Sequence, residues 1–313
     1  MFAYIVRRLI ATIPVMAVVA IFIFSLLYIS PGDPAAVIAG DLATPADIAR
    51  IHHQLGLDQP FLVRFGHWAW GVLHGDLGVS IFSGLPVWQL IAQRVEPTAA
   101  LSISTLIVSI LLAVPIGVVA AWRAGTFVDR SVMVFAVLGF SLPSFVLAYV
   151  LILVFSVELN WLPVQGYVSF HDGIVPFLQH LALPSIALGL IYAALIARIT
   201  RTSMLEVLSQ DYIRTAHAKG LANSEVLVGH ALKNAAVPIA TTIGIGIVLL
   251  IGGVVVTETV FAIPGVGRLT VDAILRRDYP IIQGVILLFS AAYVIVNLLV
   301  DISYIFLDPR VRY

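Results

Sequence analysis

Six long runs of apolar residues alternate with polar segments along the chain. A helix rises about 1.5 Å per residue, so about 20 apolar residues cross the roughly 30 Å of hydrocarbon in a bilayer. The pattern therefore predicts an all-α integral membrane protein with six transmembrane helices. The predicted spans are residues 9–32, 97–122, 131–157, 173–197, 234–257 and 279–300.

The first apolar run follows Arg7 and Arg8, an order that secretory signal peptides share. The run is longer than the about 7–15 residues that are usual in a signal peptide, and it lacks a clear small-x-small cleavage site. An uncleaved membrane anchor is therefore the favoured interpretation. We take residues 1–94 as this anchor plus an extracytoplasmic helical segment, and residues 95–313 as a second domain that contains the other five spans.

Two short helices are expected in the polar segment that follows the first run. Thr44, Pro45 and Asp47 are typical of a helix start and Gly56 of its end, whereas Pro60 opens the second helix. Because the second helix has an apolar face and an opposite polar face, we expect it along the membrane surface or against the spans. The apolar face comprises Phe61, Phe65, Trp68 and Val72, and the opposite face comprises Arg64, His67, Gly71 and His74.

An even number of spans places both ends of the chain on the same side of the membrane, and the loop charges select that side. With the N-terminus inside, most of the 17 Lys and Arg residues lie in cytoplasmic segments. The predicted outer loop at residues 158–172 contains neither Lys nor Arg. Since cytoplasmic loops carry an excess of these residues, we expect both termini in the cytoplasm.

Composition agrees with a membrane protein and excludes several other classes. Hydrophobic residues make up 60% of the chain and charged residues only 11%. The formal net charge is zero and the basic residues are dispersed, so no nucleic-acid partner is expected. The chain has no cysteine, no Walker-type glycine loop and no His-Glu-x-x-His motif. We therefore expect no cofactor, no metal site and no catalysis by this chain, with any ATP used by another subunit.

Prolines and glycines interrupt several spans, which is tolerated where neighbouring helices or a wet cavity satisfy the freed backbone groups. Gly244, Gly252 and Gly253 leave one side of the fifth span bare, which favours close helix packing over a widened passage. Polar residues within the spans are candidates to line a passage, with hydrogen bonding between helices as the equal alternative. These candidates are Ser141, Ser144, Tyr192, Thr241 and Thr242.

Glu258 ends the fifth span and is a further candidate for a gate at the outer end of a passage. A carboxylate at this depth is costly, so we expect it to have a partner. Arg268 is the nearest candidate in the sequence, beyond a Pro-Gly turn.

One long polar passage, residues 209–238, lies between two apolar runs and is therefore expected in water. It predicts two short helices joined at a glycine, and we call it the elbow. Asp211 can accept the free N–H groups of the first helix, Gly220 can end that helix, and Asn223 can cap the second. Small and basic residues on the first helix suit a partner's cleft. They are Ala216, Ala218, Arg214, His217 and Lys219.

The elbow resembles the cytoplasmic coupling loop of ABC-importer permeases, whose consensus begins Glu-Ala-Ala, then three residues and Gly. Here the corresponding residues run from Arg214 to Gly220 and read RTAHAKG. The initial Glu and the final Pro of the consensus are absent, departures that match the peptide-importer branch. SPGDPA (30–35), LGLDQP (55–60), GDLGVS (75–80) and the segments after Glu258 also resemble dipeptide and oligopeptide permeases. The alternative for the elbow is an ordinary amphipathic loop between spans.

The resemblance implies a type I ABC importer permease fold with a coupling loop at residues 201–235. It implies a second homologous permease subunit, two ABC ATPase subunits, an extracytoplasmic substrate-binding protein and a bilayer, here the bacterial inner membrane. Dipeptides or short oligopeptides are the expected cargo, with glutathione or nickel complexes as alternatives. Nearly uncharged spans argue against a secondary transporter, and a membrane scaffold gives no reason for the elbow. The implied ATPase-coupling residues are Asp211, Arg214, Thr215, Ala216, His217, Ala218, Lys219 and Gly220.

Overall fold

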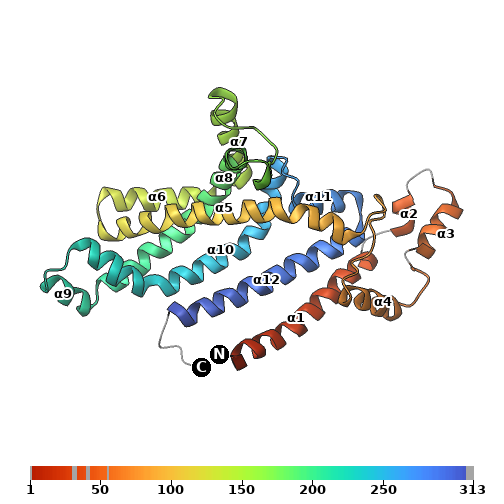
Figure 1. Ribbon diagram of the computed structural model, residues 1–313, viewed down its shortest axis with the longest axis horizontal. Helices are drawn as coiled ribbons and strands as arrows, with labels where there is room; N and C mark the ends of the chain where they lie inside the picture. Colours follow the sequence, from red (N-terminus) through yellow and green to blue (C-terminus); the bar gives the residue numbers. More distant parts are fainter. Residues whose placement is uncertain (1, 30–33, 40–42, 55, 308–313) are drawn as a thin grey trace. The chain divides into compact units, whose positions relative to one another are not determined.

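The structure is a computed structural model that describes residues 2–29, 34–39, 43–54 and 56–307. Parts of the SPGDPA and LGLDQP motifs and the last six residues of the chain lie outside the described residues. The described part is almost entirely helical (Figure 1). Its helices are α1 (Phe2–Ile29), α2 (Pro34–Ala39), α3 (Pro45–Gln54), α4 (Phe61–Leu73), α5 (Val87–Trp122), α6 (Phe127–Ser141), α7 (Ser144–Leu151), η1 (Ile152–Glu158), η2 (Phe170–Asp172), α8 (Ile174–Leu208), α9 (Asp211–Ala218), η3 (Glu225–Leu232), α10 (Lys233–Val260), α11 (Val266–Arg276) and α12 (Tyr279–Leu307).

Five helical segments of the described chain are long and apolar enough to cross a membrane. They contain most of the first, second, fourth, fifth and sixth predicted spans, which confirms those predictions at the level of helix and length. The five segments are Ile10–Leu27, Val87–Trp122, Ile174–Leu208, Glu225–Val260 and Tyr279–Ile302.

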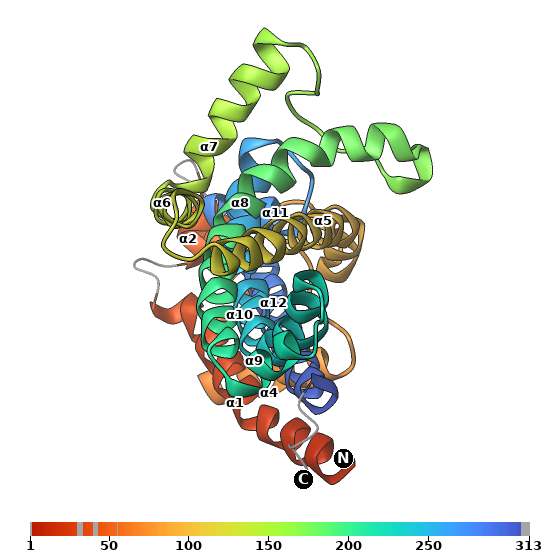
Figure 2. The same ribbon diagram turned by 90° about the vertical axis from the view of Figure 1, so that its left-hand side faces the viewer.

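The third predicted span differs from a single straight helix. α6 and the α7–η1 segment are bent by 103° at a short break that contains Leu142 and Pro143. Figure 2 looks nearly along α6 and shows α7 turning away from it. Proline has no N–H to continue the hydrogen-bond ladder, and its ring disfavours a helical conformation in the preceding residue. Each half is 15 residues long, about 22 Å, which is too short to cross a bilayer alone.

The chain divides into two compact units. The first is formed by Met1–Arg94 and Leu269–Val294, and the second by Val95–Arg268 and Ile295–Tyr313. Three helices, α5, α11 and α12, begin in one unit and end in the other.

α8 forms the centre of the second unit. It packs against α6, α7 and α10, and it is the most buried of the span-length helices. Leu188 and Tyr192 of α8 belong to the same buried cluster as Leu250 and Val254 of α10. A helix with this degree of apolar burial reads as the core of a bundle rather than as a lipid-facing helix.

The bare side of the fifth predicted span is used for close packing at two of its three glycines. A Cβ atom on Gly244 would lie 2.5 Å from Val300 Cγ2, and one on Gly253 would lie 2.7 Å from Leu188 Cδ1. Real Cβ atoms essentially never approach that closely, so a side chain at either position would displace its neighbour. The packing interpretation is therefore confirmed for Gly244 and Gly253, whereas Gly252 faces open space.

In the first unit, α4 packs against α1. This is one of the two arrangements predicted for α4, the one in which it lies against the spans. Phe24 of α1 makes ring contacts with Phe61, Phe65 and Trp68 at centroid distances of 5.3–5.6 Å. Arg64 was expected on the opposite face but is only 8% exposed, with its guanidinium 5.6 Å from the centre of the Phe24 ring. At about 100° per residue, Arg64 lies only about 60° from Phe61, so its long side chain reaches the aromatic cluster.

Candidate functional site

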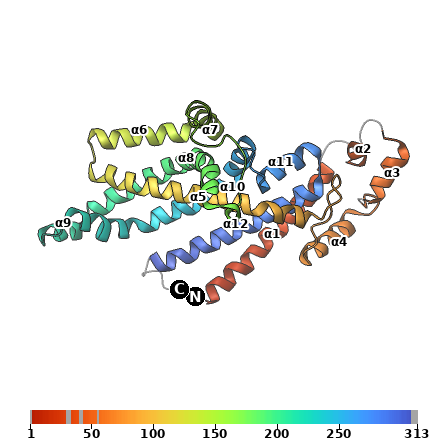
Figure 3. The ribbon, with the colours of Figure 1, turned by 45° about the horizontal axis from the view of Figure 1, so that its top comes forward.

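The elbow consists of two helices joined at Gly220, as the sequence predicts. α9 covers Asp211–Ala218, and the second helix begins at Asn223 and continues through η3 into α10. Gly220 has φ +80°, a conformation that a residue with a Cβ adopts only at a cost. Figure 3 shows α9 at the end of the pair formed by α8 and α10.

The capping of the two elbow helices differs from the expected pattern. Asp211 is the first residue of α9, where it pairs with Arg214 at 3.4 Å and favours the positive end of the helix. The second helix is capped by Glu225, whose carboxylate accepts the N–H of Ala222 at 3.3 Å. Asn223, which the sequence offered as the cap of the second helix, is instead the first residue of that helix.

One face of α9 packs into the elbow and the other is exposed. Ile213 and Ala216 are buried in a cluster with Met204, Val226 and Ala231. The small size of Ala216 therefore has a reason within this chain. The remaining implied coupling residues are all exposed, and we call them the α9 outer face. They are Asp211, Arg214, Thr215, His217, Ala218, Lys219 and Gly220.

A bidentate ion pair fixes α8 near the elbow. The Nε and Nη2 atoms of Arg201 both donate to the Asp129 carboxylate, the second at 2.7 Å, and the N–H of Gly125 donates to it at 2.9 Å. The Asp129 side chain is 5% exposed and that of Arg201 22%. A bidentate arginine–carboxylate pair is among the strongest hydrogen-bond arrangements in proteins. It joins the start of α6 to α8, and the sequence analysis did not identify it.

Glu258 is completely buried and satisfied by its own chain. Its carboxylate accepts hydrogen bonds from the Thr98 hydroxyl at 2.6 Å and from the backbone N–H of Arg268 at 2.9 Å. The Thr98 hydroxyl in turn accepts the N–H of Val266 at 2.8 Å. Val266 is the first residue of α11, so the carboxylate lies at the positive end of that helix. Arg268 is thus a partner of Glu258 through its main chain.

Two glycines leave room for the Glu258 carboxylate. A Cβ atom on Gly265 would overlap the carboxylate, and one on Gly267 would lie 2.9 Å from its Oε2 atom. The Pro-Gly turn and Glu258 therefore form one fitted unit that connects the end of α10, the start of α11 and α5. We call Glu258, Thr98, Gly265, Val266 and the Arg268 N–H the α11 latch.

The other candidate passage residues are distributed over four helices. The hydroxyls of Ser141, Thr241 and Thr242 each bond the carbonyl four residues earlier in their own helix. Tyr192 is buried in the core of the second unit, and Ser144 begins α7 directly after the bend. Ser141 also lines a cavity of about 130 Å³ between α6 and α8, together with Arg198.

The loop between η1 and α8 is attached to α5 by polar contacts. One carboxylate oxygen of Glu96 accepts from the Ser169 hydroxyl at 2.6 Å and from the Tyr167 hydroxyl at 3.0 Å. Burial, and then the hydrogen bond to Glu96, raises the pKa of Tyr167 above its ordinary value. Tyr167 therefore stays protonated and remains a donor across the physiological range.

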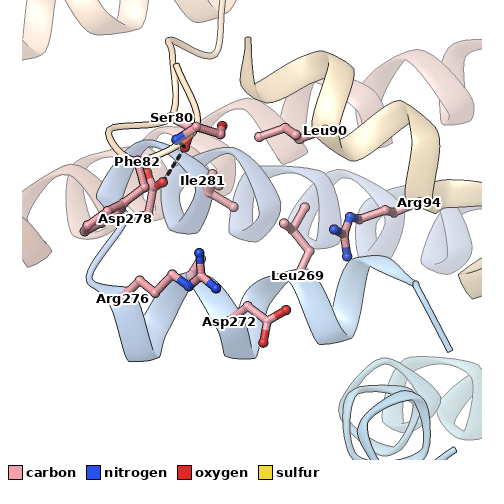
Figure 4. A pocket seen from close by; sticks show the side chains of 11 residues that line it. Ser80, Phe82, Leu90, Arg94, Leu269, Asp272, Arg276, Asp278 and Ile281 are labelled. Carbon is pink, nitrogen blue, oxygen red and sulfur yellow. Dashed lines mark hydrogen bonds between the residues drawn. The ribbon is translucent and has the colours of Figure 1, made fainter. Parts of the chain in front are cut away.

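Asp278 and Ser80 form a contact in the first unit that the sequence analysis missed. The Ser80 hydroxyl donates to the Asp278 carboxylate at 2.5 Å (Figure 4). The N–H of Ile81 donates to the other oxygen of that carboxylate at 3.3 Å. The contact joins the GDLGVS segment to the start of α12. Ser80 belongs to the GDLGVS segment, which resembles a segment of peptide permeases. Ser80 and Asp278 are 198 residues apart, however, and the sequence gave no indication that they are in contact.

The chain matches two protein families along almost its whole length. Residues 113–313 match the family described as the binding-protein-dependent transport system inner membrane component. Residues 1–102 match the family of N-terminal segments of the same transport-system membrane components.

Individual relatives are similar over the whole chain. A probable peptide ABC transporter permease protein of Sinorhizobium fredii is 57% identical over 99% of each chain. A putative peptide transport system permease protein of Brucella abortus is 47% identical over 100% of each chain, and the glutathione transport system permease protein of Salmonella choleraesuis is 44% identical over 100% of each. Among solved structures, the MetNI methionine ABC transporter matches 71% of this chain and 97% of its own, with a TM-score of 0.59 and 17% identity. That likeness concerns the fold.

Proposed function

Because this chain belongs to the family of binding-protein-dependent transport system inner membrane components, and is thus a multi-pass permease subunit of an ABC importer, we propose that it carries dipeptides or short oligopeptides. Two relatives at 57% and 47% identity carry peptide transport in their names. The relative at 44% identity is named for glutathione, so glutathione is the second candidate cargo. The membrane is the bacterial inner membrane, with both chain termini in the cytoplasm.

The complete transporter contains a second homologous permease subunit, two ABC ATPase subunits and an extracytoplasmic substrate-binding protein. The sequence of this chain has no phosphate-binding glycine loop, so ATP is hydrolysed in the partner subunits. In this assembly the chain supplies part of the passage and catalyses no covalent step.

The α9 outer face couples the permease to an ATPase subunit. The observation that carries this proposal is the two-sided character of α9, in which Ile213 and Ala216 are buried and the polar residues are exposed. A helix seated in this way transmits a displacement to α8 and α10 instead of bending alone. The Arg201–Asp129 pair extends the same displacement to the start of α6.

In this mechanism, closure of the ATPase subunits moves α9 and changes the arrangement of the spans. The passage then switches between inward-facing and outward-facing states. Ser141, Ser144, Tyr192, Thr241 and Thr242 are the residues we propose to line it. Glu258 contributes indirectly, because its enclosed carboxylate holds the start of α11 rather than facing an open path.

The test is transport by the assembled complex in proteoliposomes. We expect labelled dipeptide to accumulate only when ATP and the binding protein are both present, and to accumulate faster than labelled glutathione. A faster rate for glutathione would select the second candidate. Absence of ATP-dependent accumulation of either compound, with all subunits assembled, would contradict the proposed cargo class.

Cysteine labelling tests the proposed orientation. The native chain has no cysteine, so Gln165→Cys and Lys219→Cys each introduce a single reactive site at an exposed position. We expect an impermeant maleimide to label Gln165→Cys from outside and Lys219→Cys only after the membrane is permeabilised. Labelling of both from the same side would overturn the six-span arrangement.

A further inference from the structure

A cavity of about 240 Å³ in the first unit combines both signs of charge with an apolar wall. It lies between α11, the starts of α5 and α12, and the segment that contains Ser80. Figure 4 shows Arg94 of α5 and Arg276 of α11 directed toward the cavity from different sides, with Asp272 on α11 between them. None of these three residues belongs to the coupling or passage residues discussed above.

One wall of the cavity is held in place by hydrogen bonds. Asp278 lines the cavity and its carboxylate accepts from the Ser80 hydroxyl and the Ile81 N–H, so it is engaged within the wall. The Ser80 hydroxyl also accepts the N–H of Ser83 at 3.1 Å. A wall fixed in this way is shaped before any ligand arrives, which lowers the entropic cost of binding.

The charges that line the cavity balance each other. Arg94 and Arg276 contribute two guanidinium groups, and Asp272 and Asp278 contribute two carboxylates. Guanidinium groups recognise carboxylates through paired hydrogen bonds, and a carboxylate such as that of Asp272 accepts from an ammonium group. The balance favours a ligand that itself carries one charge of each sign.

From this chemistry we propose that the cavity binds a short zwitterionic peptide of about dipeptide size. Its terminal carboxylate lies at Arg94 and Arg276, its terminal ammonium lies at Asp272, and a small apolar side chain lies against Leu269 and Ile281. Sites for drug-sized ligands have volumes of about 300–1,000 Å³. The cavity is smaller than these sites, and this size suits a dipeptide. The peptide class rests on the proposed function, whereas the position of this site is independent of it.

The experiment measures equilibrium binding of tritiated glycyl-leucine to the full chain in lipid nanodiscs, without ATPase or binding protein. Competition with unlabelled glycyl-leucinamide and N-acetyl-glycyl-leucine removes the carboxylate and the ammonium group in turn. We expect saturable binding that either competitor displaces at least about tenfold less well than glycyl-leucine, because each lacks one charge-assisted contact.

Two neighbouring arginines provide a matched pair of variants. Arg276 lines the cavity and Arg277 does not, and both are exposed at the end of α11. We expect Arg276→Gln to weaken glycyl-leucine binding about tenfold or more, and Arg277→Gln to change it by less than about twofold. In the Asp272→Asn variant, N-acetyl-glycyl-leucine should compete about as well as unlabelled glycyl-leucine. The reason is that the variant lacks the carboxylate that favours a ligand with an ammonium group.

Three results would overturn the proposal: no saturable binding to the native chain, equal losses in both arginine variants, or equal competition by the amide and the free acid. If native binding is absent but Arg276→Gln weakens capture of the purified binding protein, the cavity receives a side chain of that partner and the peptide site is wrong. ATP-driven dipeptide uptake by the assembled transporter would then still stand, so the two proposals fail separately.

Discussion

The carboxylate of Glu258 is fully enclosed, whereas the polar side chains of the α9 outer face lie almost entirely in solvent. Glu258 receives hydrogen bonds from Thr98 and from the Arg268 N–H, and it has 0% of its surface exposed. Asp211 and Arg214 on α9 pair with each other at 3.4 Å, with side chains 96% and 79% exposed. Both regions belong to the second unit, yet they place charge in opposite environments.

The difference separates charges that hold the fold from charges that are available to a partner. Removing one member of a buried, hydrogen-bonded set leaves the others unsatisfied, so the cost falls on the fold. An exposed pair such as Asp211–Arg214 contributes about 0–1 kcal/mol, so stability does not explain the polar residues of α9. Binding explains them better, because a helix seated on a buried core presents them in a fixed arrangement.

The largest effect is expected at the α11 latch. Glu258→Ala leaves the Thr98 hydroxyl and the Arg268 N–H without their acceptor, which should lower the free energy of unfolding by about 2–6 kcal/mol at about 1–3 kcal/mol per buried donor. Denaturant unfolding of the purified chain in nanodiscs measures this. The exposed Glu206→Ala is the control, with an expected change within about 0.5 kcal/mol. Equal stability of the two variants would place Glu258 among the solvated residues.

A smaller loss is expected at the pair that fixes α8 beside α6. Asp129→Asn keeps the shape of the side chain but removes the charge that Arg201 contacts with two nitrogen atoms. Loss of a charge-assisted hydrogen bond should lower the free energy of unfolding by about 1–3 kcal/mol. Asp172→Asn, at the exposed end of η2, is the matched control in the same unfolding assay. If both variants unfold alike, the pair does not stabilise this end of the bundle.

Local features of the fold could be predicted from the sequence because they depend on nearby residues. Hydropathy identified the long helices, and the helix formers before Gly220 identified α9. Gly220 was expected to end that helix, and its φ of +80° suits this position. Pro143 indicated a break, but no local rule gives the size of the bend, which is 103°. Arg64 illustrates the same limit, since a polar residue near the edge of an apolar face can turn inward onto Phe24.

Within the candidate site, the sequence predicted which residues form the elbow but not which of them face outward. The spacing of Ile213 and Ala216 matches one helical face, so their burial could have been inferred from periodicity. The contacts of Asp129 with Arg201 and of Ser80 with Asp278 join residues 72 and 198 positions apart. Pairing over such separations is decided by the tertiary fold, and a single sequence carries no signal for it.

Two alanines of α9 sharpen the comparison between its faces. Ala216 is 7% exposed in the elbow core, so Ala216→Trp overpacks that core and should lower the free energy of unfolding by about 1–3 kcal/mol. Ala218 is exposed, so Ala218→Trp should change it by less than about 0.5 kcal/mol. Unfolding in nanodiscs measures both. Equal destabilisation would mean that α9 has no free face.

Ala218→Trp should have the smallest effect on stability and yet clearly impair the coupling of ATP hydrolysis to dipeptide uptake. If the α9 outer face enters an ATPase groove, the indole of Ala218→Trp occupies space that the partner needs, and overpacking a fitted contact costs about 1–3 kcal/mol of association. Recovery of the complex should fall, or ATP hydrolysis should continue without dipeptide uptake, while the isolated chain unfolds normally. Ala124→Trp provides the control, because Ala124 is exposed in the turn between α5 and α6 and lies outside α9. We expect that variant to assemble and transport normally. Normal assembly, hydrolysis and uptake by Ala218→Trp as well would show that the exposed side of α9 contacts no ATPase, and the elbow would be only a connection between α8 and α10.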